Sequence, residues 1–128
     1  WLIFFILFLG IEINDNIEDV LWLSNKVSQL RIFADENGIM NKSVIDAEGD
    51  ILVVSQFTLH AKIKKGSRPS YIKAAKPEKA HILYKSFIKE LSSLLERNVQ
   101  QGKFGANMQV SIVNDGPVTI FIDSKKKE

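Results

Sequence analysis

The hydrophobic and polar positions along the chain predict an alternation of strands and helices. Trp1 to Leu9 is an unbroken apolar run. It is too short to span a bilayer, which takes about 20 residues, and it is typical of a fully buried strand. Ile51 to Val54 is a second apolar run of this kind. Met108 to Val113, with alternating polarity, and Val118 to Ile122 predict two closing strands joined by a tight turn.

Two further stretches have the spacing of an amphipathic helix. The first follows Asn14-Asp15-Asn16, all residue types that cap helices, and it carries Glu18 and Asp19 where the helix dipole favours negative charge. The second begins at Pro77, which suits the first helical position because an N–H has no partner there. Its predicted buried stripe consists of Leu83, Tyr84, Phe87, Ile88, Leu91, Leu94 and Leu95.

Composition places the chain among globular domains and removes several kinds of chemistry. With 128 residues, 45% of them apolar, the chain is long enough for one domain with a substantial core. It has no cysteine, so disulfides, thiolate nucleophiles and zinc–thiolate sites are excluded. The charge is uneven: residues 1–50 hold nine acidic and three basic side chains, whereas residues 51–128 hold six acidic and fourteen basic ones.

Much of the positive charge lies in one segment, between Lys62 and Lys79. Seven basic residues there accompany a single acidic one, Glu78. Such a segment attracts phosphate backbones in a salt-dependent way, and it is equally typical of a solvated lysine-rich loop. The candidates for contact with a nucleic acid are Lys62, Lys64, Lys65 and Arg68.

Few side chains offer catalytic chemistry. Hydroxyls stand at Ser55 and Thr58, directly after an apolar run, but a hydroxyl is a weak nucleophile without a neighbouring base. Neither His60 nor His81 belongs to a recognisable catalytic or metal-binding motif. Hydrolysis here would therefore depend on substrate positioning and on backbone donors, and we expect no metal or organic cofactor.

The turn between the two predicted closing strands is a second candidate for function. It contains Gly116 and Pro117; glycine accepts positive φ, and proline fixes φ and donates no hydrogen bond. The pair is either a plain turn or a rigid device that presents backbone carbonyls to a ligand. The second interpretation requires another stretch to meet the turn, and the candidate is Ser55 to Leu59.

Two motifs together give a resemblance to a known family. Ser55–Leu59 (SQFTL) and Asn114–Thr119 (NDGPVT) resemble the two signature motifs of the D-aminoacyl-tRNA deacylases, also called D-tyrosyl-tRNA deacylases. Leu30–Phe33, Gly66–Ser70 and Phe104–Val110 are similar to further landmarks of that family in order and spacing. The resemblance implies an enzyme that hydrolyses the ester between a D-amino acid, or glycine, and the terminal adenosine of tRNA.

The resemblance also implies roles for particular residues. Phe104 and Met108 would receive the adenosine, and the Gly116–Pro117 peptide would be cis. This turn would reach into the site of a second subunit in a homodimer and exclude L-amino acids by steric clash. The ribose 2′-hydroxyl of the substrate would assist the reaction. The catalytic pocket would be lined by the first motif, Ser55, Gln56, Phe57 and Thr58, with Thr58 positioning the substrate rather than attacking it.

We therefore predict an α/β fold of the α+β type with a mostly antiparallel, curved, barrel-like sheet and two packed helices. Residues 1–128 are expected to form a single compact domain, N-terminally incomplete, because the resemblance implies two strands before Trp1 to Leu9. The expected partners are aminoacyl-tRNA and a second copy of the chain in the cytoplasm, with no membrane contact. Two alternatives are a nucleic-acid-binding module without catalysis and an inactive truncated homologue.

Overall fold

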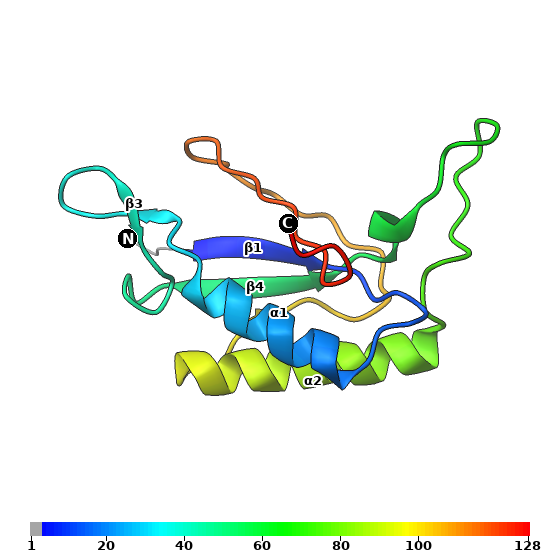
Figure 1. Ribbon diagram of the computed structural model, residues 1–128, viewed down its shortest axis with the longest axis horizontal. Helices are drawn as coiled ribbons and strands as arrows, with labels where there is room; N and C mark the ends of the chain where they lie inside the picture. The colour runs from blue at the N-terminus through cyan, green and yellow to red at the C-terminus, as the bar shows by residue number, and fades with distance from the viewer. Residues whose placement is uncertain (1–3) are drawn as a thin grey trace.

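The computed structural model describes residues 4–128, and within them a three-stranded parallel sheet forms the centre (Figure 1). Strand β1 (Phe4–Leu9) pairs with β4 (Asp50–Ser55), and β4 pairs on its other side with the short β5 (Gln100–Gln101). The strand predicted at residues 51–54 is confirmed. The strand predicted at residues 1–9 is confirmed from residue 4 onward, and its first three residues lie outside the described part.

The prediction of a mostly antiparallel, barrel-like sheet is wrong. β1 and β4 run parallel, and the described sheet is open at its edges. Helix α1 (Ile17–Gln29) lies in the connection from β1 to β4, and helix α2 (Pro77–Leu95) lies in the connection from β4 to β5. Each helix returns the chain to the end of the sheet where the previous strand began, so the next strand runs in the same direction.

An antiparallel pair does occur, but it is small and separate. Strand β2 (Phe33–Ala34) pairs with β3 (Met40–Lys42) in a two-stranded ladder. Its turn is ordered by the Asp35 carboxylate, which accepts the backbone N–H groups of Asn37 at 2.8 Å and Ile39 at 3.0 Å. The bond from Ile39 is the largest of the contacts that lower the pKa of Asp35.

Both helices begin where the sequence predicts. At α1, the Asn16 side chain accepts the N–H of Glu18 at 2.9 Å, and the Asp19 carboxylate accepts the N–H of Asn16 at 2.9 Å. This reciprocal capping box satisfies backbone donors that have no partner within the helix. At α2, Pro77 occupies the first turn. No helix in residues 4–128 is long and apolar enough to cross a membrane.

The hydrophobic core lies between the sheet and the two helices, which pack against each other on one side of β1 and β4 (Figure 1). Ile51 and Val53 of β4 are fully buried, and so is Phe87 of α2. Tyr84 adds a polar tie, because its hydroxyl donates to the carbonyl of Val53 at 3.1 Å. The predicted stripe of α2 is buried except at Leu94, which is half-buried.

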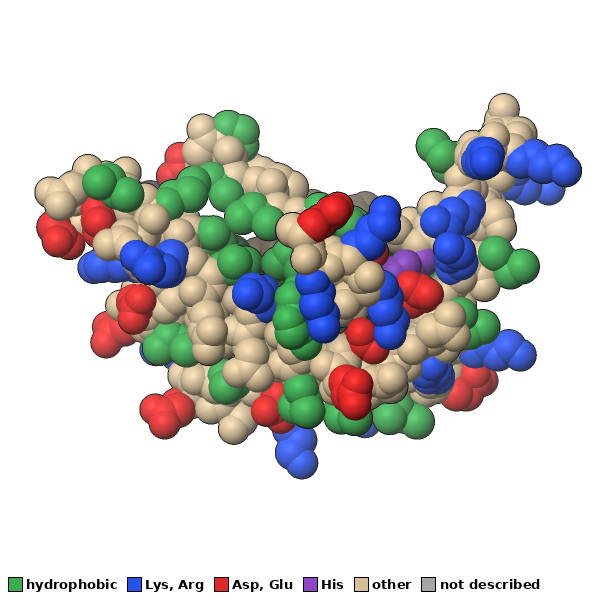
Figure 2. Space-filling view, viewed as in Figure 1, with side chains coloured by type: hydrophobic (Ala, Val, Ile, Leu, Met, Phe, Trp, Pro, Cys, Tyr) green, Lys and Arg blue, Asp and Glu red, His purple; other side chains and the backbone are tan. Residues whose placement is uncertain are grey.

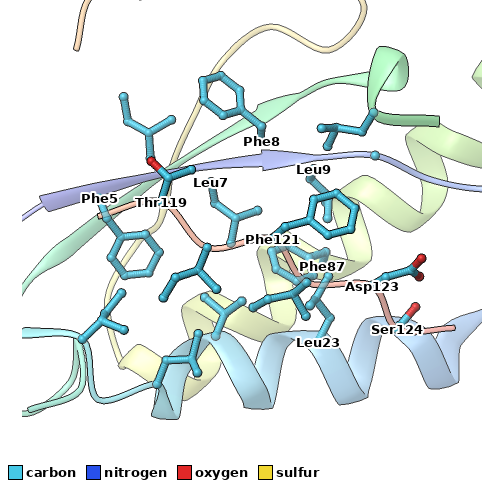
Figure 3. Close-up of a pocket in the computed structure, with 18 of the residues that line it drawn as sticks. Phe5, Leu7, Phe8, Leu9, Leu23, Phe87, Thr119, Phe121, Asp123 and Ser124 are labelled. Carbon is cyan, nitrogen blue, oxygen red and sulfur yellow. The ribbon is translucent and has the colours of Figure 1, made fainter. Parts of the chain in front are cut away.

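The closing strands predicted at residues 108–113 and 118–122 do not form. Both segments carry no strand pairing in the described part of the chain, although they pass close to β1 (Figures 1 and 3). Most of their apolar side chains are exposed, with Val113 at 94% and Phe121 at 75%. Apolar patterning predicts which faces seek burial, but a strand also needs a neighbouring edge whose backbone groups can pair with its own.

Candidate active site

The first motif lies at the carboxyl end of β4, where parallel sheets commonly present binding groups. Ser55 is the last residue of that strand and lies opposite Leu9 of β1. The N–H of Gln56 donates to the carbonyl of Leu9 at 2.8 Å, which extends the contact with β1 by one residue. The short 3₁₀ helix η1 (Phe57–His60) follows at once. The motif is therefore held by the central strand and by its neighbour.

Side-chain contacts within the motif are few and specific. The Gln56 side-chain amide donates to the hydroxyl oxygen of Thr58. An amide holds this hydroxyl in place but cannot remove its proton, so the contact orients Thr58 without activating it as a nucleophile. The hydroxyl oxygen of Ser55 accepts the N–H of Gly105 at 3.4 Å. This bond brings the segment around Gly105 to the end of β4.

Phe104 and Met108 lie against the body of the protein close to that segment. The ring of Phe104 stacks on His81 with centroids 4.7 Å apart and planes 16° apart, and it also contacts Tyr84 at 5.2 Å. The Met108 sulfur covers Gly102, where an added Cβ would lie 2.8 Å from it. Both Phe104 and Met108 are half-buried. The structure thus brings Phe104 near Ser55 and packs its ring on α2.

The Gly116–Pro117 turn stands apart from the first motif. Its peptide bond is cis, and Gly116 has φ of +131°, where an added Cβ would lie 2.9 Å from a methyl carbon of Val118. The Asn114 side chain braces the turn by accepting the N–H of Val118 at 3.1 Å and donating to Thr119 at 2.9 Å. Figure 1 shows the exposed tip at the upper left and η1 at the upper right. The two motifs of one protomer therefore do not meet.

A groove of about 1790 Å³ lies between β1, α1 and residues 111–126 (Figure 3). Phe5, Leu7 and Leu9 of β1 point into it, towards Leu23 of α1 and Phe121 of the later segment. The lining is mainly apolar and comes from the faces next to the core. The groove lining includes Lys62, with Leu59, Asn114, Asp115, Val118 and Thr119 of the two motifs, but it does not include Ser55, Gln56, Phe57, Thr58, Phe104, Met108, Gly116 or Pro117.

The predicted contacts with nucleic acid lie on a projecting loop, residues 61–76, here called the basic loop. Lys62 and Ser70 close its stem with two backbone hydrogen bonds of 2.8 and 2.9 Å. Lys64, Lys65 and Arg68 lie in the exposed tip between them. Figure 2 shows Lys and Arg side chains gathered on this projection at the upper right. The loop therefore presents a compact positive surface away from the body of the protein.

The C-terminal end is fastened to the start of α1 by a group of polar contacts, here called the C-terminal clasp. The Lys125 ammonium lies 3.0 Å from Asp19 and 3.9 Å from Asp15, and the Ser124 hydroxyl donates to Asp19 at 2.8 Å. Burial by itself raises the pKa of Asp19, but hydrogen bonds from Asn16, Lys125 and Ser124 lower it overall. Burial is the largest influence on Asp15 and raises its pKa.

Two rings beside the predicted site were missed by the sequence analysis. Tyr71 of the basic loop contacts Phe57 of η1 edge-on, with centroids 5.0 Å apart and planes 72° apart. The sequence signal that could have indicated Tyr71 is an aromatic residue among the basic residues of this segment. His81 stacks on Phe104, as described above. No local signal joins His81 to a residue so distant in sequence.

Comparisons with known proteins converge on one family. Residues 5–123 match the family described as D-Tyr-tRNA(Tyr) deacylase. A D-aminoacyl-tRNA deacylase of Bacteroides fragilis is 61% identical over 119 residues, which are 93% of this chain and 79% of the relative. One from Flavobacterium psychrophilum is 60% identical over 123 residues, which are 96% of this chain and 82% of the relative.

Two solved structures are similar to this fold. A c-Myc DNA unwinding element binding protein has a TM-score of 0.83 at 42% identity, covering 90% of this chain and 78% of its own. A probable eukaryotic D-amino acid tRNA deacylase has a TM-score of 0.64 at 16% identity, covering 81% of this chain and 75% of its own. The second similarity concerns the fold alone.

Proposed function

Because the chain belongs to the D-Tyr-tRNA(Tyr) deacylase family, it is a hydrolase of D-aminoacyl-tRNA, and we propose that its Gly116–Pro117 turn selects the D configuration. In this reaction water adds to the ester carbonyl, and the bond to the ribose oxygen of the terminal adenosine breaks. The products are the free D-amino acid and tRNA. None of the comparisons favours a binding module without catalysis, since the DNA element in one name belongs to that other protein.

Selection by the turn works through steric exclusion. The carbonyls of Gly116 and Pro117 hold the α-amino group of the substrate, so the side chain of a D-amino acid points towards solvent. The side chain of an L-amino acid points into the turn and clashes. A filter of this kind rejects a configuration rather than recognising a side chain. It therefore accepts glycine and many different D-amino acids.

The active enzyme is a homodimer in which each turn enters the site of the other subunit. The observation that carries this assignment is the separation of the two motifs within one protomer (Figure 1). The segment around the turn also exposes apolar side chains of the kind found at subunit interfaces, Val113 at 94% and Phe121 at 75%. A second copy would cover those side chains and complete both sites at once.

Catalysis at residues 55–58 relies on positioning rather than on a protein nucleophile. The Thr58 hydroxyl, held by the Gln56 amide, orients the ester, and backbone N–H groups stabilise the developing oxyanion. The ribose 2′-hydroxyl assists the attacking water. Ser55 holds the segment that carries Phe104, and Phe104 and Met108 frame the terminal adenosine.

Affinity for tRNA comes from the basic loop through Lys62, Lys64, Lys65 and Arg68. These side chains contact phosphates of the acceptor stem, which supply affinity without reading sequence.

Charge reversal at Lys64 and Lys65 is expected to raise KM for tRNA and to flatten the dependence of binding on salt, because fewer counterions are released. An unchanged binding constant at low salt would remove this role. We further propose that residues 1–128 form a single deacylase domain that acts in the cytoplasm.

The test of the proposed filter compares hydrolysis of D- and L-tyrosyl-tRNA by wild type and Gly116→Ala. An added Cβ at Gly116 meets Val118 at 2.9 Å, so the turn must shift, and we expect slower D-hydrolysis and a smaller preference for D over L. Gly38→Ala is the matched control, because Gly38 also has positive φ, +76°, but has nothing within 4 Å of an added Cβ. An unchanged D preference in Gly116→Ala would contradict the assignment.

A further inference from the structure

The basic loop is fixed at its base as well as at its stem. The N–H of Ala75 donates to the carbonyl of Ile11 at 2.9 Å, and the N–H of Ile13 donates to the carbonyl of Lys73 at 2.9 Å. Ile11 and Ile13 directly follow β1, the strand that pairs with β4. The loop is therefore an arm mounted on the same sheet that carries the catalytic motif.

A direct contact joins this arm to the motif. Tyr71 lies just after the stem that Lys62 and Ser70 close, and its ring meets the ring of Phe57 at 5.0 Å and 72°. This edge-to-face geometry is an attractive one for aromatic pairs. Phe57 is otherwise 57% exposed, so the core does not immobilise its ring. The contact with Tyr71 therefore restrains the Phe57 ring, which the hydrophobic core does not.

We propose that Tyr71 is a positioning residue that holds Phe57 and the Gln56–Thr58 contact in the geometry needed for ester hydrolysis when the basic loop engages tRNA. This inference rests on the proposed roles of residues 55–58 and of the basic loop. The phosphates of the acceptor stem hold the basic loop, the basic loop holds Tyr71, and Tyr71 holds Phe57 at the start of η1. Binding of the acceptor stem is thereby linked to the alignment of the reacting ester.

The kinetic test uses two substrates, D-tyrosyl-tRNA and the short ester 3′-D-tyrosyl-adenosine, which has no acceptor stem. Tyr71→Ala is expected to lower kcat roughly three- to tenfold on D-tyrosyl-tRNA, the range that loss of one aromatic pair gives, and to change kcat little on the short ester, which has no stem to engage the basic loop. It is also expected to raise KM for the tRNA alone, because the arm is less well held. A residue that merely stiffened the loop would change KM for tRNA and leave both kcat values at the wild-type level.

Two matched variants separate the ring contact from other effects. Tyr71→Phe keeps the ring and removes the hydroxyl, so it is expected to restore wild-type kcat on D-tyrosyl-tRNA. Ile72→Ala changes the adjacent residue, which is 80% exposed, and is expected to match wild type. If Tyr71→Phe is as slow as Tyr71→Ala, the ring contact is not the cause and the inference fails.

Hydrogen exchange tests the contact without depending on activity. The N–H groups of Leu59 and Ala61 donate to the carbonyls of Gln56 at 3.3 Å and Thr58 at 3.1 Å, so their protection reports the order of η1. Tyr71→Ala is expected to speed exchange at both amides, and Tyr71→Phe is not. Unchanged exchange in Tyr71→Ala overturns the positioning role. A wild-type protein that fails to hydrolyse D-tyrosyl-tRNA counts against the proposed function instead.

Discussion

Strand β4 and residues 108–122 are both rich in apolar residues, yet they have opposite environments. In β4, Val53 is fully buried, whereas Val113 of the later segment is 94% exposed. β4 has β1 on one side and β5 on the other, so its backbone groups pair in both directions. Residues 108–122 have no paired strand in the described part of the chain. Apolar patterning therefore indicates which side chains gain from burial. Whether a strand forms depends on whether a neighbouring strand has an edge with free backbone N–H and C=O groups.

This difference in exposure also suggests that β4 and residues 108–122 contribute to different processes, folding of the protomer and association of two copies. Side chains of β4 and α2 contribute to the folding of one protomer, because they lose contact with water when the chain folds. The side chains on either side of Gly116–Pro117, such as Val113 and Phe121, are exposed to water in one protomer, and in the proposed homodimer they would contribute to assembly instead. Changes in the two regions are thus expected to act on different equilibria.

The largest effect is expected from a matched pair of phenylalanine substitutions. Phe87→Ala in α2 should lower the free energy of unfolding by about 3–5 kcal/mol, since the side chain is 1% exposed and leaves a cavity. Phe121→Ala, at 75% exposure, should change it by about 0.5 kcal/mol or less. Denaturant unfolding of dilute protein measures both values. Equal losses would show that the later segment belongs to the protomer core.

The C-terminal clasp fastens the chain directly after residues 108–122 to the start of α1, and its loss should have an intermediate effect. Asp19→Ala removes the acceptor for Ser124 and Lys125 and also half of the capping box. We expect a loss of about 1–2 kcal/mol in the free energy of unfolding. Ser124→Ala keeps the capping box and is the control, with a smaller expected loss. If the two variants lose the same amount, the cap contributes nothing measurable.

A smaller effect is expected from Val113→Thr, which makes an exposed position polar. The free energy of unfolding of the protomer should change by about 0.5 kcal/mol or less. The dissociation constant of the proposed homodimer should rise about fivefold, which corresponds to about 1 kcal/mol of lost apolar burial. Sedimentation at several protein concentrations measures it. An unchanged dissociation constant would place Val113 outside the subunit interface.

The smallest effect is the pH dependence of the clasp. The pKa of Asp19 is lower in the folded protein than its ordinary value of 3.8, so the unfolded chain binds this proton first as pH falls. The stability that Asp19 contributes is therefore complete above that value and is lost as pH falls through the folded-state pKa. Asp15, with its raised pKa, acts in the opposite direction. The difference between wild type and Asp19→Ala should narrow between pH 7 and pH 3.

Features encoded by adjacent residues were predictable from the sequence. The capping residues Asn14 to Asn16 and Pro77 indicate helix starts because their signals act within one turn, and the structure shows Asn16 as the cap of α1. The position of Ser55 at the end of a buried strand follows from the apolar run before it. The parallel direction of the sheet was not predictable in this way, because it depends on how whole crossovers pack. The strands predicted at residues 108–113 and 118–122 do not form, because an apolar pattern within a segment does not provide a neighbouring strand to pair with.

Contacts between distant residues left no local signal. Asp19 and Lys125 are 106 positions apart, and nothing in the residues around either one indicates the other as its partner. His81 and Phe104 meet only because α2 passes beneath the end of β4. The resemblance to the deacylases predicted which residues belong to the site, whereas the structure shows that Phe57 packs on Tyr71 and Phe104 packs on His81. Sequence motifs thus indicate candidate site residues, whereas the side chains that pack against those residues are known only from the structure.

The hydrogen bond between Tyr84 and the carbonyl of Val53 makes this residue an optical reporter for the strand that carries the site. Burial raises the pKa of Tyr84 above its ordinary value, so the folded protein retains the neutral phenol into the alkaline range. The stability linked to this proton is complete below about pH 10 and is lost as pH rises through the folded-state pKa. Ultraviolet absorbance of its phenolate would then appear as β4 separates from α2. In Tyr71→Phe, where Tyr84 is the one tyrosine of the sequence, alkaline titration can thus follow the release of β4 without an added label.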